Sequence, residues 1–497
     1  MNTASEEMPP AAPIDMSAVR IDPSWALRIP VSLARRKKVL PCCRMGDRVL
    51  VACIDQNDVA TLDTVERHLD HPIEPVLAEE SSLESAVRDT FGGAVTRTGT
   101  VRVATGRGNE DDDAVQICEE ILQAAALREA SDIHIDPLTQ RVRVRLRVDG
   151  QLEDYRFFSS ELHPLISSRV KVLADMDISE RRSPQDGRFS WTSSRGESID
   201  VRVATLPTSF GESLTLRLLA SNMENLTLAR LGMDSDDLER FSTGINRPYG
   251  MVLLTGPTGS GKSTTLYAAL RQLVSTRALH VVTVEDPVEY EMEGITQVAV
   301  DSADKVSFSK ALRSILRNDP DVIMIGEIRD AETANVAIKA ALTGHLVFST
   351  LHTNTAAGAV TRLIDMGVQP FLVAATLRLA VAQRLVRRLC QHCSTQTSLS
   401  ASEAAALGNP SIQDLTAWES EGCIYCAGRG KVGRTGLFEM LPVGEAMAQL
   451  ISSGADEVLL HELARKEGCR TLSEDALRKI EQGIVMAPDA RSAVAVW

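Results

Sequence analysis

A glycine-rich segment has the residue types and spacing of a phosphate-binding loop. It follows an apolar run, Tyr249–Thr255, and precedes a predicted helix that continues to Leu273. Its glycines let backbone N–H groups turn toward phosphate oxygens, and the helix N-terminus adds partial positive charge. Lys262 is expected to reach the β and γ phosphates, and Ser263 to ligate Mg²⁺. This is a Walker A loop in its required context, and the predicted nucleotide-binding residues are Gly256, Pro257, Thr258, Gly259, Ser260, Gly261, Lys262, Ser263 and Thr264.

A second apolar run ends on a carboxylate. Residues 321–327 read Asp-Val-Ile-Met-Ile-Gly-Glu, the pattern of a Walker B strand. A carboxylate at the end of such a strand can order Mg²⁺ and the attacking water beside the γ-phosphate, which gives Glu327 this role.

Other polar side chains lie at the ends of neighbouring strands. Glu285, Asp286 and Glu289 lie at the end of a predicted strand that begins at Val281, and His345 and His352 bracket a strand between them. Three acidic residues this close together are as often part of a solvated turn as part of a metal-binding or catalytic site. The neighbouring strand ends favour a role at the metal. A single histidine is more often structural than catalytic, although two around one strand improve the odds of a functional role.

Two pairs of cysteines have the spacing of a metal site. Cys390 and Cys393 form one C-x₂-C pair, and Cys423 and Cys426 form another. Four thiolates so arranged predict a closed, structural Zn²⁺ site, with four reduced cysteines lacking metal as the alternative. The remaining cysteines lack this spacing and are interpreted as packing residues.

Changes in composition divide the chain into segments. Residues 1–21, rich in Pro and Ala, are expected to be a flexible tail, and residues 92–112, rich in Gly, Thr and Arg, a linker. Residues 22–91 predict a small α/β domain, with a strand at Arg48–Cys53 and helices near 58–69 and 81–91. We recognise no counterpart for this domain.

Residues 113–222 predict a second α/β domain. A helix is expected over 114–129, and Arg141–Val148 alternates arginine with apolar residues, so its four arginines share one strand face. Asp149-Gly150 predicts a hairpin turn after it. A row of arginines can contact phosphates, but a solvated sheet face is the commoner interpretation. From 223 to 497, apolar runs alternate with helical segments, which predicts a parallel sheet with crossover helices.

The overall charge argues against nucleic acid as a partner. The 497 residues include 53 Lys+Arg and 67 Asp+Glu, with a formal net charge of −14. A protein that neutralises nucleic-acid phosphates is usually basic. The acidic, proline-containing N-terminus does not read as a signal peptide, and no apolar stretch reads as a membrane span.

Four motifs in order resemble those of one protein family. GPTGSGKST, VEDPVEY, ILRNDPDVIMIGEIRD and TGHLVFSTLHTN are similar to the Walker A, Asp box, Walker B and His box of the type II secretion ATPases GspE and the type IV pilus assembly ATPases PilB. The similarity extends to ASDIHI, RVDG, SPQDGR and DVRVATLP upstream and to the cysteine pairs downstream, over roughly residues 113–497. It implies a RecA-like P-loop ATPase domain at 223–497 with a tetracysteine zinc subdomain at 389–430, preceded by a PAS-like α/β domain.

The resemblance also implies roles for individual residues. Glu285 and Asp286 support the metal, and Glu327 orients the water. Arg202 and Arg217 match arginines that the family brings from the preceding domain to the phosphates. Arg317 and Arg329 match arginines that flank Walker B and are considered essential, and His352 lies in the His box. The implied cofactors are ATP, Mg²⁺ and Zn²⁺.

The family works as homo-hexameric motors in the cytoplasm. The resemblance implies a peripheral place at the inner membrane, with a polytopic platform protein and the cytoplasmic domain of a bitopic component as partners. Residues 22–91 are expected to bind a partner at the membrane, whose identity the sequence does not give. The leading hypothesis is pseudopilus assembly and protein export by a type II secretion system, which the single short domain before the linker favours. Type IV pilus assembly is the alternative. The acidic net charge disfavours a nucleic-acid translocase. The presence of Glu327 disfavours a scaffold protein that binds ATP without hydrolysing it.

Overall fold

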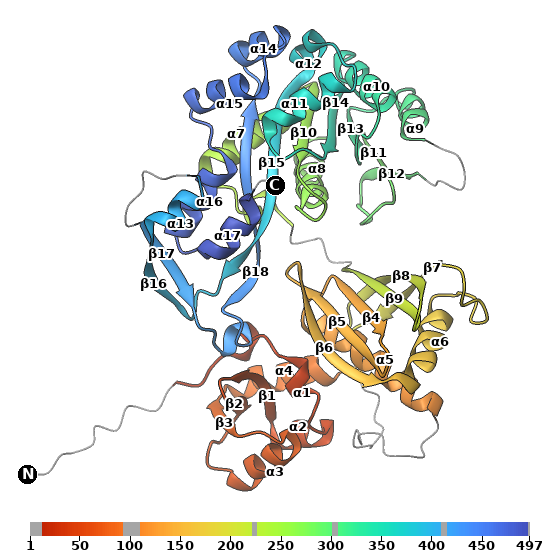
Figure 1. The fold of residues 1–497 in the computed structure, drawn as a ribbon, viewed down its shortest axis with the longest axis vertical. Coiled ribbons are helices and arrows are strands. Elements are labelled where there is room, and N and C mark those ends of the chain that lie inside the picture. The colour runs from red at the N-terminus through yellow and green to blue at the C-terminus, as the bar shows by residue number, and fades with distance from the viewer. Residues whose placement is uncertain (1–11, 93–109, 221–225, 301–306, 409–414, 496–497) are drawn as a thin grey trace, which may run out of the picture. The chain divides into compact units, whose positions relative to one another are not determined.

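The computed structural model describes residues 12–92, 110–220, 226–300, 307–408 and 415–495 (Figure 1). They form two compact units. The first unit lies within residues 1–221 and also contains 390–394 and 420–432; the second contains the rest. The predicted zinc subdomain, 389–430, is therefore divided between the units, whereas we expected it to belong wholly to the ATPase domain. Within the described ranges, every helix is too short or too polar to cross a bilayer.

The first unit begins with a small domain on a three-stranded sheet. The order is β1-β2-β3, with β1 and β2 antiparallel and β2 and β3 parallel. The predicted strand and both predicted helices are present. Ile14 forms a β-bridge with Ala78, and Met16 is buried, so the fold begins inside the segment that we expected to be a tail. The elements are α1 (Pro23–Ala26), α2 (Val31–Lys37), β1 (Val39–Met45), β2 (Arg48–Cys53), α3 (Val59–Leu69), β3 (Ile73–Leu77) and α4 (Glu80–Phe91).

The second domain of this unit is a six-stranded antiparallel sheet with helices on one face. The strand order is β6-β5-β4-β9-β8-β7. The predicted alternation along β5 is confirmed, because its valines and leucine are buried while its arginines are not. Asp149 and Gly150 adopt positive φ angles of 50° and 84°, as a tight hairpin turn requires. The elements are α5 (Glu110–Leu127), β4 (Asp132–Pro137), β5 (Arg141–Val148), β6 (Gln151–Ser159), α6 (His163–Leu173), β7 (Gln185–Thr192), β8 (Ser198–Thr208) and β9 (Gly211–Ala220).

Most of the expected linker, residues 93–109, lies outside the described residues. Its last residues belong to α5, which begins at Glu110, before the expected start at Ala114. The expected boundary at 222 also lies in a range that the structure does not describe.

The second unit contains a seven-stranded sheet in the order β12-β11-β13-β14-β10-β15-β18. The neighbouring strands from β12 to β15 run parallel, as predicted. Parallel strands end at one edge of a sheet, so the loops after β10, β11, β13 and β14 lie at a common edge. The strands are β10 (Gly250–Thr255), β11 (Val281–Glu285), β12 (Ile295–Ala299), β13 (Val322–Ile325), β14 (Leu346–Leu351), β15 (Leu377–Leu389) and β18 (Lys431–Pro442).

Helices cover both faces of this sheet. Met251 and Leu253 of β10 belong to one hydrophobic cluster, and Val252 and Leu254 to another, so the strand is buried on both sides. The first cluster includes residues of α9 (Phe308–Ile315), α10 (Ala331–Leu342), α11 (Ala356–Asp365) and α12 (Pro370–Thr376). The second includes residues of α7 (Ser235–Ile245) and α8 (Lys262–Thr276).

The C-terminal elements extend the first of these clusters. Met447, Ile451, Leu460 and Leu477 are buried in it. Strands β16 and β17 form a separate two-stranded sheet. The elements are β16 (Ser394–Leu399), α13 (Ala401–Ala406), β17 (Leu415–Ser420), α14 (Glu445–Ser452), α15 (Glu457–Lys466), α16 (Leu472–Glu481) and α17 (Ala487–Val494).

Candidate active site

The glycine-rich loop connects β10 to α8, the context that the sequence predicts. Gly256, Gly259 and Gly261 have φ angles of 145°, 78° and 87°, which disfavour residues with a Cβ. At Gly256 space is also lacking, because an added Cβ would lie 2.4 Å from the Gln383 carbonyl oxygen. Helix α8 starts at Lys262, so its unpaired N–H groups face the loop. The loop therefore has the conformation of a phosphate cradle.

The Lys262 ammonium is buried inside this loop. Its Nζ donates to the carbonyl oxygens of Gly256, at 2.8 Å, and Pro257, at 3.0 Å. Burial lowers the pKa of Lys262 to about 8, although the charge of Glu327 opposes this shift. The loop thus holds a cation in a poorly solvated place, where an anionic phosphate would stabilise it.

Nucleotide binding is expected to raise the pKa of Lys262, since a polyphosphate adds negative charge beside it. Binding at about pH 9 should then take up a sizeable fraction of one proton, and affinity should fall as the pH rises through the unliganded pKa. Calorimetric titration with ADP in two buffers of different ionisation enthalpy measures this uptake. Lys262→Arg is the control, because its guanidinium keeps its proton at this pH. Equal uptake by both proteins would contradict the assignment.

Glu327 follows β13 and lies beside two cationic or ionisable groups. Its carboxylate accepts a hydrogen bond from Arg329 and lies 3.4 Å from His352 Nε2. Burial alone would raise the pKa of Glu327, but the hydrogen bond and charge of Arg329, together with His352, outweigh it and hold the pKa below its usual value. Glu327 is therefore ionised at neutral pH, the state in which it can accept a proton from water.

Glu285 is less accessible than its place in the sequence suggests. It is 4% exposed and accepts hydrogen bonds from Tyr267 Oη, from Thr283 Oγ1 at 2.6 Å and from Gln297 Nε2 at 3.2 Å. The carboxylate thus connects α8 to β11 and β12. Asp286, the next residue, is exposed.

Two other residues singled out from the sequence, Arg317 and His345, bond to groups near the ends of helices. Arg317 donates to the Arg313 carbonyl oxygen, at 2.9 Å, and to Ser314 Oγ, at 3.2 Å, near the end of α9. His345 Nδ1 lies 3.0 Å from the Ala340 carbonyl oxygen and closes the end of α10. The structure therefore brings Arg329 and His352 to Glu327, but gives Arg317 and His345 local partners.

Arg202 and Arg217 belong to the first unit, where they face each other on β8 and β9. Arg217 Nε donates to the buried carboxylate of Asp132 at 3.1 Å. The register continues this line to Arg147 on β5 and Arg188 on β7. Four arginines and one aspartate thus form a row across the polar face of the sheet. The sequence predicts the arginines of one strand, but the row depends on strand order, which it does not reveal.

The polar pair Gln383-Arg384 is not among the residues predicted from the sequence. The pair interrupts the apolar strand β15 immediately beyond Ala382, which pairs with Thr255 at the start of the glycine-rich loop. Thr265 Oγ1 donates to Gln383 Oε1 at 2.9 Å, so β15 contacts α8 as well. Two adjacent polar residues inside an otherwise apolar strand were the feature of the sequence that could have indicated a functional role for this pair.

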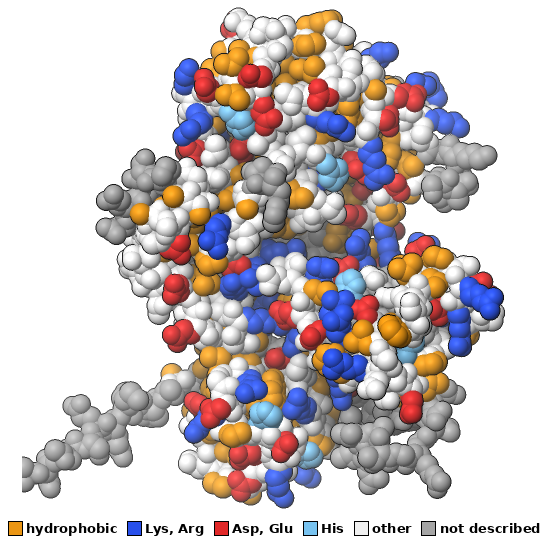
Figure 2. Space-filling model, in the orientation of Figure 1, with side chains coloured by type: hydrophobic (Ala, Val, Ile, Leu, Met, Phe, Trp, Pro, Cys, Tyr) orange, Lys and Arg blue, Asp and Glu red, His pale blue; other side chains and the backbone are white. Residues whose placement is uncertain are grey.

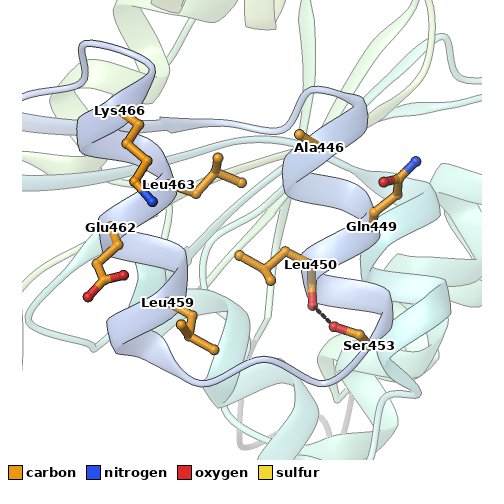
Figure 3. Close-up of a pocket in the computed structure, with 8 residues that line it drawn as sticks. All are labelled: Ala446, Gln449, Leu450, Ser453, Leu459, Glu462, Leu463 and Lys466. Atoms are coloured by element: carbon orange, nitrogen blue, oxygen red, sulfur yellow. Dashed lines mark hydrogen bonds between the residues drawn. The ribbon is translucent and has the colours of Figure 1, made fainter.

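A shallow groove lies elsewhere in the second unit, between α14 and α15 (Figure 3). Leu450, Leu459 and Leu463 line it, with Glu462 and Lys466 along one side. None of its lining residues belongs to the loops around Lys262 and Glu327. The phosphate chemistry and this groove are therefore separate features.

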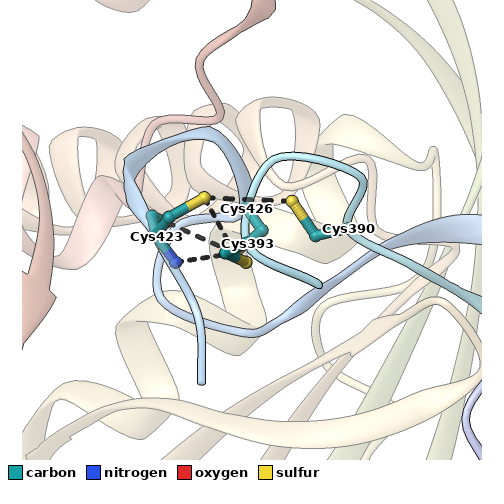
Figure 4. A group of neighbouring side chains, drawn as sticks. All are labelled: Cys390, Cys393, Cys423 and Cys426. Atoms are coloured by element: carbon teal, nitrogen blue, oxygen red, sulfur yellow. Dashed lines mark hydrogen bonds between the residues drawn. The ribbon is translucent and has the colours of Figure 1, made fainter. Parts of the chain in front are cut away.

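The four predicted metal ligands meet at one point (Figure 4). The Sγ–Sγ distances are 3.8 Å for Cys390–Cys423, 3.9 Å for Cys393–Cys426 and 3.8 Å for Cys423–Cys426. Sulfurs about 2.3 Å from a tetrahedral Zn²⁺ lie about 3.8 Å apart, so the group fits this ion. A search of the described residues for three or more His, Cys, Asp or Glu side chains that could hold a metal finds this group alone.

The surroundings of these sulfurs also suit thiolates. The N–H groups of Cys423 and Gly430 each donate to Cys426 Sγ at 3.1 Å. Ser420 Oγ lies 2.9 Å from Cys393 Sγ. The His392 ring stacks on Tyr425 with centroids 3.9 Å apart, and Ile424 joins the hydrophobic cluster of the small N-terminal domain. This tetracysteine knuckle, Cys390–Cys393 and Cys423–Cys426, is therefore part of the first unit.

A glycine-rich loop with a buried lysine and an ionised glutamate, both at the carboxyl edge of a parallel sheet, define a P-loop ATPase. The chain belongs to the Type II/IV secretion system protein family, whose model matches residues 108–492. It is an ATP-hydrolysing enzyme with a RecA-like fold, as the resemblance to GspE and PilB implied. Residues 8–97, for which we recognised no counterpart, match the MshEN domain.

Individual relatives agree with this family. The type IV pilus assembly ATPase PilB of Myxococcus xanthus is 39% identical over 490 residues, which cover 95% of this chain and 86% of that protein. Type II secretion system protein E of Pseudomonas aeruginosa is 39% identical over 477 residues, or 92% of this chain and 94% of that protein. The crystal structure of the pilus retraction motor PilT with bound ADP matches with a TM-score of 0.50 and 27% identity, over 75% of this chain and 95% of that chain.

Proposed function

We propose that this chain is the motor ATPase of a type II secretion system, in which ATP hydrolysis drives pseudopilus assembly and protein export. The observation that carries the proposal is the pairing of Lys262 in the phosphate cradle with an ionised Glu327 at the same sheet edge. This arrangement serves hydrolysis rather than nucleotide binding alone. It disfavours a scaffold without turnover.

Relatives of both kinds match this chain, and higher identities occur among the type II secretion proteins. Type II secretion system protein E of Klebsiella pneumoniae is 48% identical over 71% of the chain, whereas the Myxococcus xanthus PilB is 39% identical over 95%. Type IV pilus assembly is the second candidate, because that PilB covers nearly the whole chain. On the face shown in Figure 2, acidic and basic side chains are interspersed, which is unlike the basic surface of a nucleic-acid translocase.

The site suits ATP with Mg²⁺. Lys262 and the backbone of the cradle would hold the phosphates. The hydroxyl of Ser263, at the second position of α8, and the Glu327 carboxylate are hard oxygen ligands of the kind that Mg²⁺ prefers. The ion supplies charge neutralisation at the phosphates, while Glu327 accepts the proton of the attacking water.

The working assembly is a homo-hexameric ring at the cytoplasmic face of the inner membrane. The partners of the ring are the cytoplasmic domain of a bitopic secretion component and a polytopic platform protein, and residues 22–91 bind a partner at the membrane. These proposals rest on the resemblance to GspE.

Genetic complementation tests the choice of system. Deletion of the gene in its host should abolish export of secreted proteins and leave surface pili intact. The wild-type gene, but not one encoding Lys262→Ala, should restore export. Loss of pili with normal export would instead identify the pilus assembly ATPase, and phosphate release that needs added DNA would identify a translocase.

Purified protein is expected to contain about one Zn²⁺ per chain, bound by the tetracysteine knuckle. Cys390→Ser or Cys423→Ser should lower this content and loosen residues 389–430, because metal binding supplies folding free energy to such sites. Elemental analysis and limited proteolysis measure the two effects. Cys469→Ser, at a buried cysteine outside the knuckle, is the control and should keep the ion. The site would be contradicted if wild-type protein, prepared without chelator, contained no zinc.

A further inference from the structure

Strand β15 continues past the start of the phosphate-binding loop and places an arginine there. Ala382 pairs with Thr255, the last residue of β10, so Gln383 and Arg384 lie beside the first loop residues. A Cβ on Gly256 would be 3.0 Å from Arg384 Nη1. The guanidinium therefore lies against the loop that holds Lys262.

Arg384 also binds the loop that follows β14. Its Nη2 donates to the carbonyl oxygen of Asn354, at 3.1 Å, and to Asn354 Oδ1, at 3.2 Å, while Nη1 donates to the Gln383 carbonyl oxygen at 3.1 Å. Asn354 is two residues from His352, whose Nε2 lies 3.4 Å from the Glu327 carboxylate. One side chain thus joins β15 to the loop that carries His352.

The same loop is also held by hydrogen bonds from Thr353 to Thr255 of β10 and from Thr355 to Glu457 of α15. The Thr353 N–H donates to Thr255 Oγ1 at 2.8 Å. Asn354 is exposed, and Arg384 is the residue of β15 that donates a hydrogen bond to it. Losing this contact would leave the loop held at Thr353 and Thr355 but would remove its anchor at Asn354, two residues from His352.

The charge of Arg384 acts on the cradle too. The group is half-buried, and burial lowers the pKa of Arg384. After burial, its positive charge further lowers the pKa of Lys262, which places both cations within electrostatic reach of one another. A polyphosphate in the cradle would relieve this repulsion.

We propose that Arg384 is a positioning residue for ATP hydrolysis, which holds the loop 352–355 against the phosphate-binding loop so that His352 stays beside Glu327. The inference concerns the hydrolytic site and applies to a secretion or a pilus ATPase alike. An arginine suits the task because its planar fork reaches two acceptors on one residue while it also contacts a third, which the single ammonium of a lysine does not reproduce.

Steady-state kinetics of the full-length protein test this role. Arg384→Ala should lower kcat by roughly tenfold to a hundredfold, the range that small misplacements of catalytic groups cause, with KM for ATP changed by less than about threefold. Arg384→Lys should recover little of this loss, since positive charge alone does not bridge the loops. Arg388→Ala, an exposed arginine on the same strand, is the matched control and should keep the wild-type kcat.

A double-mutant cycle separates positioning from general support of the fold. Asn354→Ala removes only the side-chain acceptor and should lower kcat less than Arg384→Ala does. In the Arg384→Ala background it should lower kcat no further, because the contact is already gone. Independent, multiplicative losses would overturn the proposal, as would wild-type kcat in Arg384→Ala. A parallel fall in kcat, ATP affinity and melting temperature would also overturn it by showing a structural role alone.

Discussion

Replacing Glu327 with Gln is expected to stop ATP turnover while ATP still binds. The amide has the shape of the carboxylate but cannot accept a proton from the attacking water, and a general base commonly contributes about 10² to 10⁴ in rate. Lys262 and the glycine-rich backbone are unchanged, so affinity for ATP should stay within a few-fold of wild type. Phosphate release and equilibrium nucleotide binding measure the two quantities.

Glu332→Gln provides the matched control for this variant. Glu332 lies on α10, shortly after Glu327, and its exposed carboxylate pairs with Arg313 at 2.7 Å. It has no contact with the phosphate-binding loop among the described interactions, so turnover should remain normal. Hydrolysis by Glu327→Gln at the wild-type rate would show that another group activates the water.

Replacing Arg202 or Arg217 with Ala is expected to lower turnover far more than nucleotide affinity. The resemblance assigns both arginines to the phosphates of bound ATP, where they meet charge that develops in the transition state. Arginines with this role contribute about 10³ to 10⁵ in rate in other phosphoryl-transfer enzymes. Phosphate release by each variant, compared with its affinity for ATP, measures the separation.

The control for these arginines is Arg195→Ala. Arg195 is an exposed residue between β7 and β8, on the same sheet but outside the row of arginines. Its turnover should match that of wild type. Normal rates of phosphate release by Arg202→Ala and Arg217→Ala would show that these arginines do not act on ATP and are surface residues that pair with nearby carboxylates.

The parts of the site that one segment determines could be predicted from the sequence. The cradle depends on glycines at fixed spacing between an apolar strand and a helix, and the structure has that strand ending at Thr255 and that helix starting at Lys262. The same holds for the hairpin at Asp149-Gly150. In each case local backbone chemistry, rather than the tertiary fold, decides the result.

The features that depend on strand order could not be predicted in this way. Gln383 and Arg384 contact the phosphate-binding loop only because β15 lies beside β10. The row from Arg147 to Arg188 likewise needs five strands in register. Glu285 read as an acid at a strand end, but its burial among Tyr267, Thr283 and Gln297 results from packing between α8 and β12.

The tetracysteine knuckle belongs to the first unit, although it lies in the chain between β15 and β18, strands that pair in the sheet of the second unit. The main chain passes between the two units near residue 222 and again after residues 389, 394, 419 and 432. The knuckle is thus a second place, besides that near residue 222, where the two units are linked covalently. If its four cysteines no longer hold it together, that link changes from a folded element to an open stretch of chain.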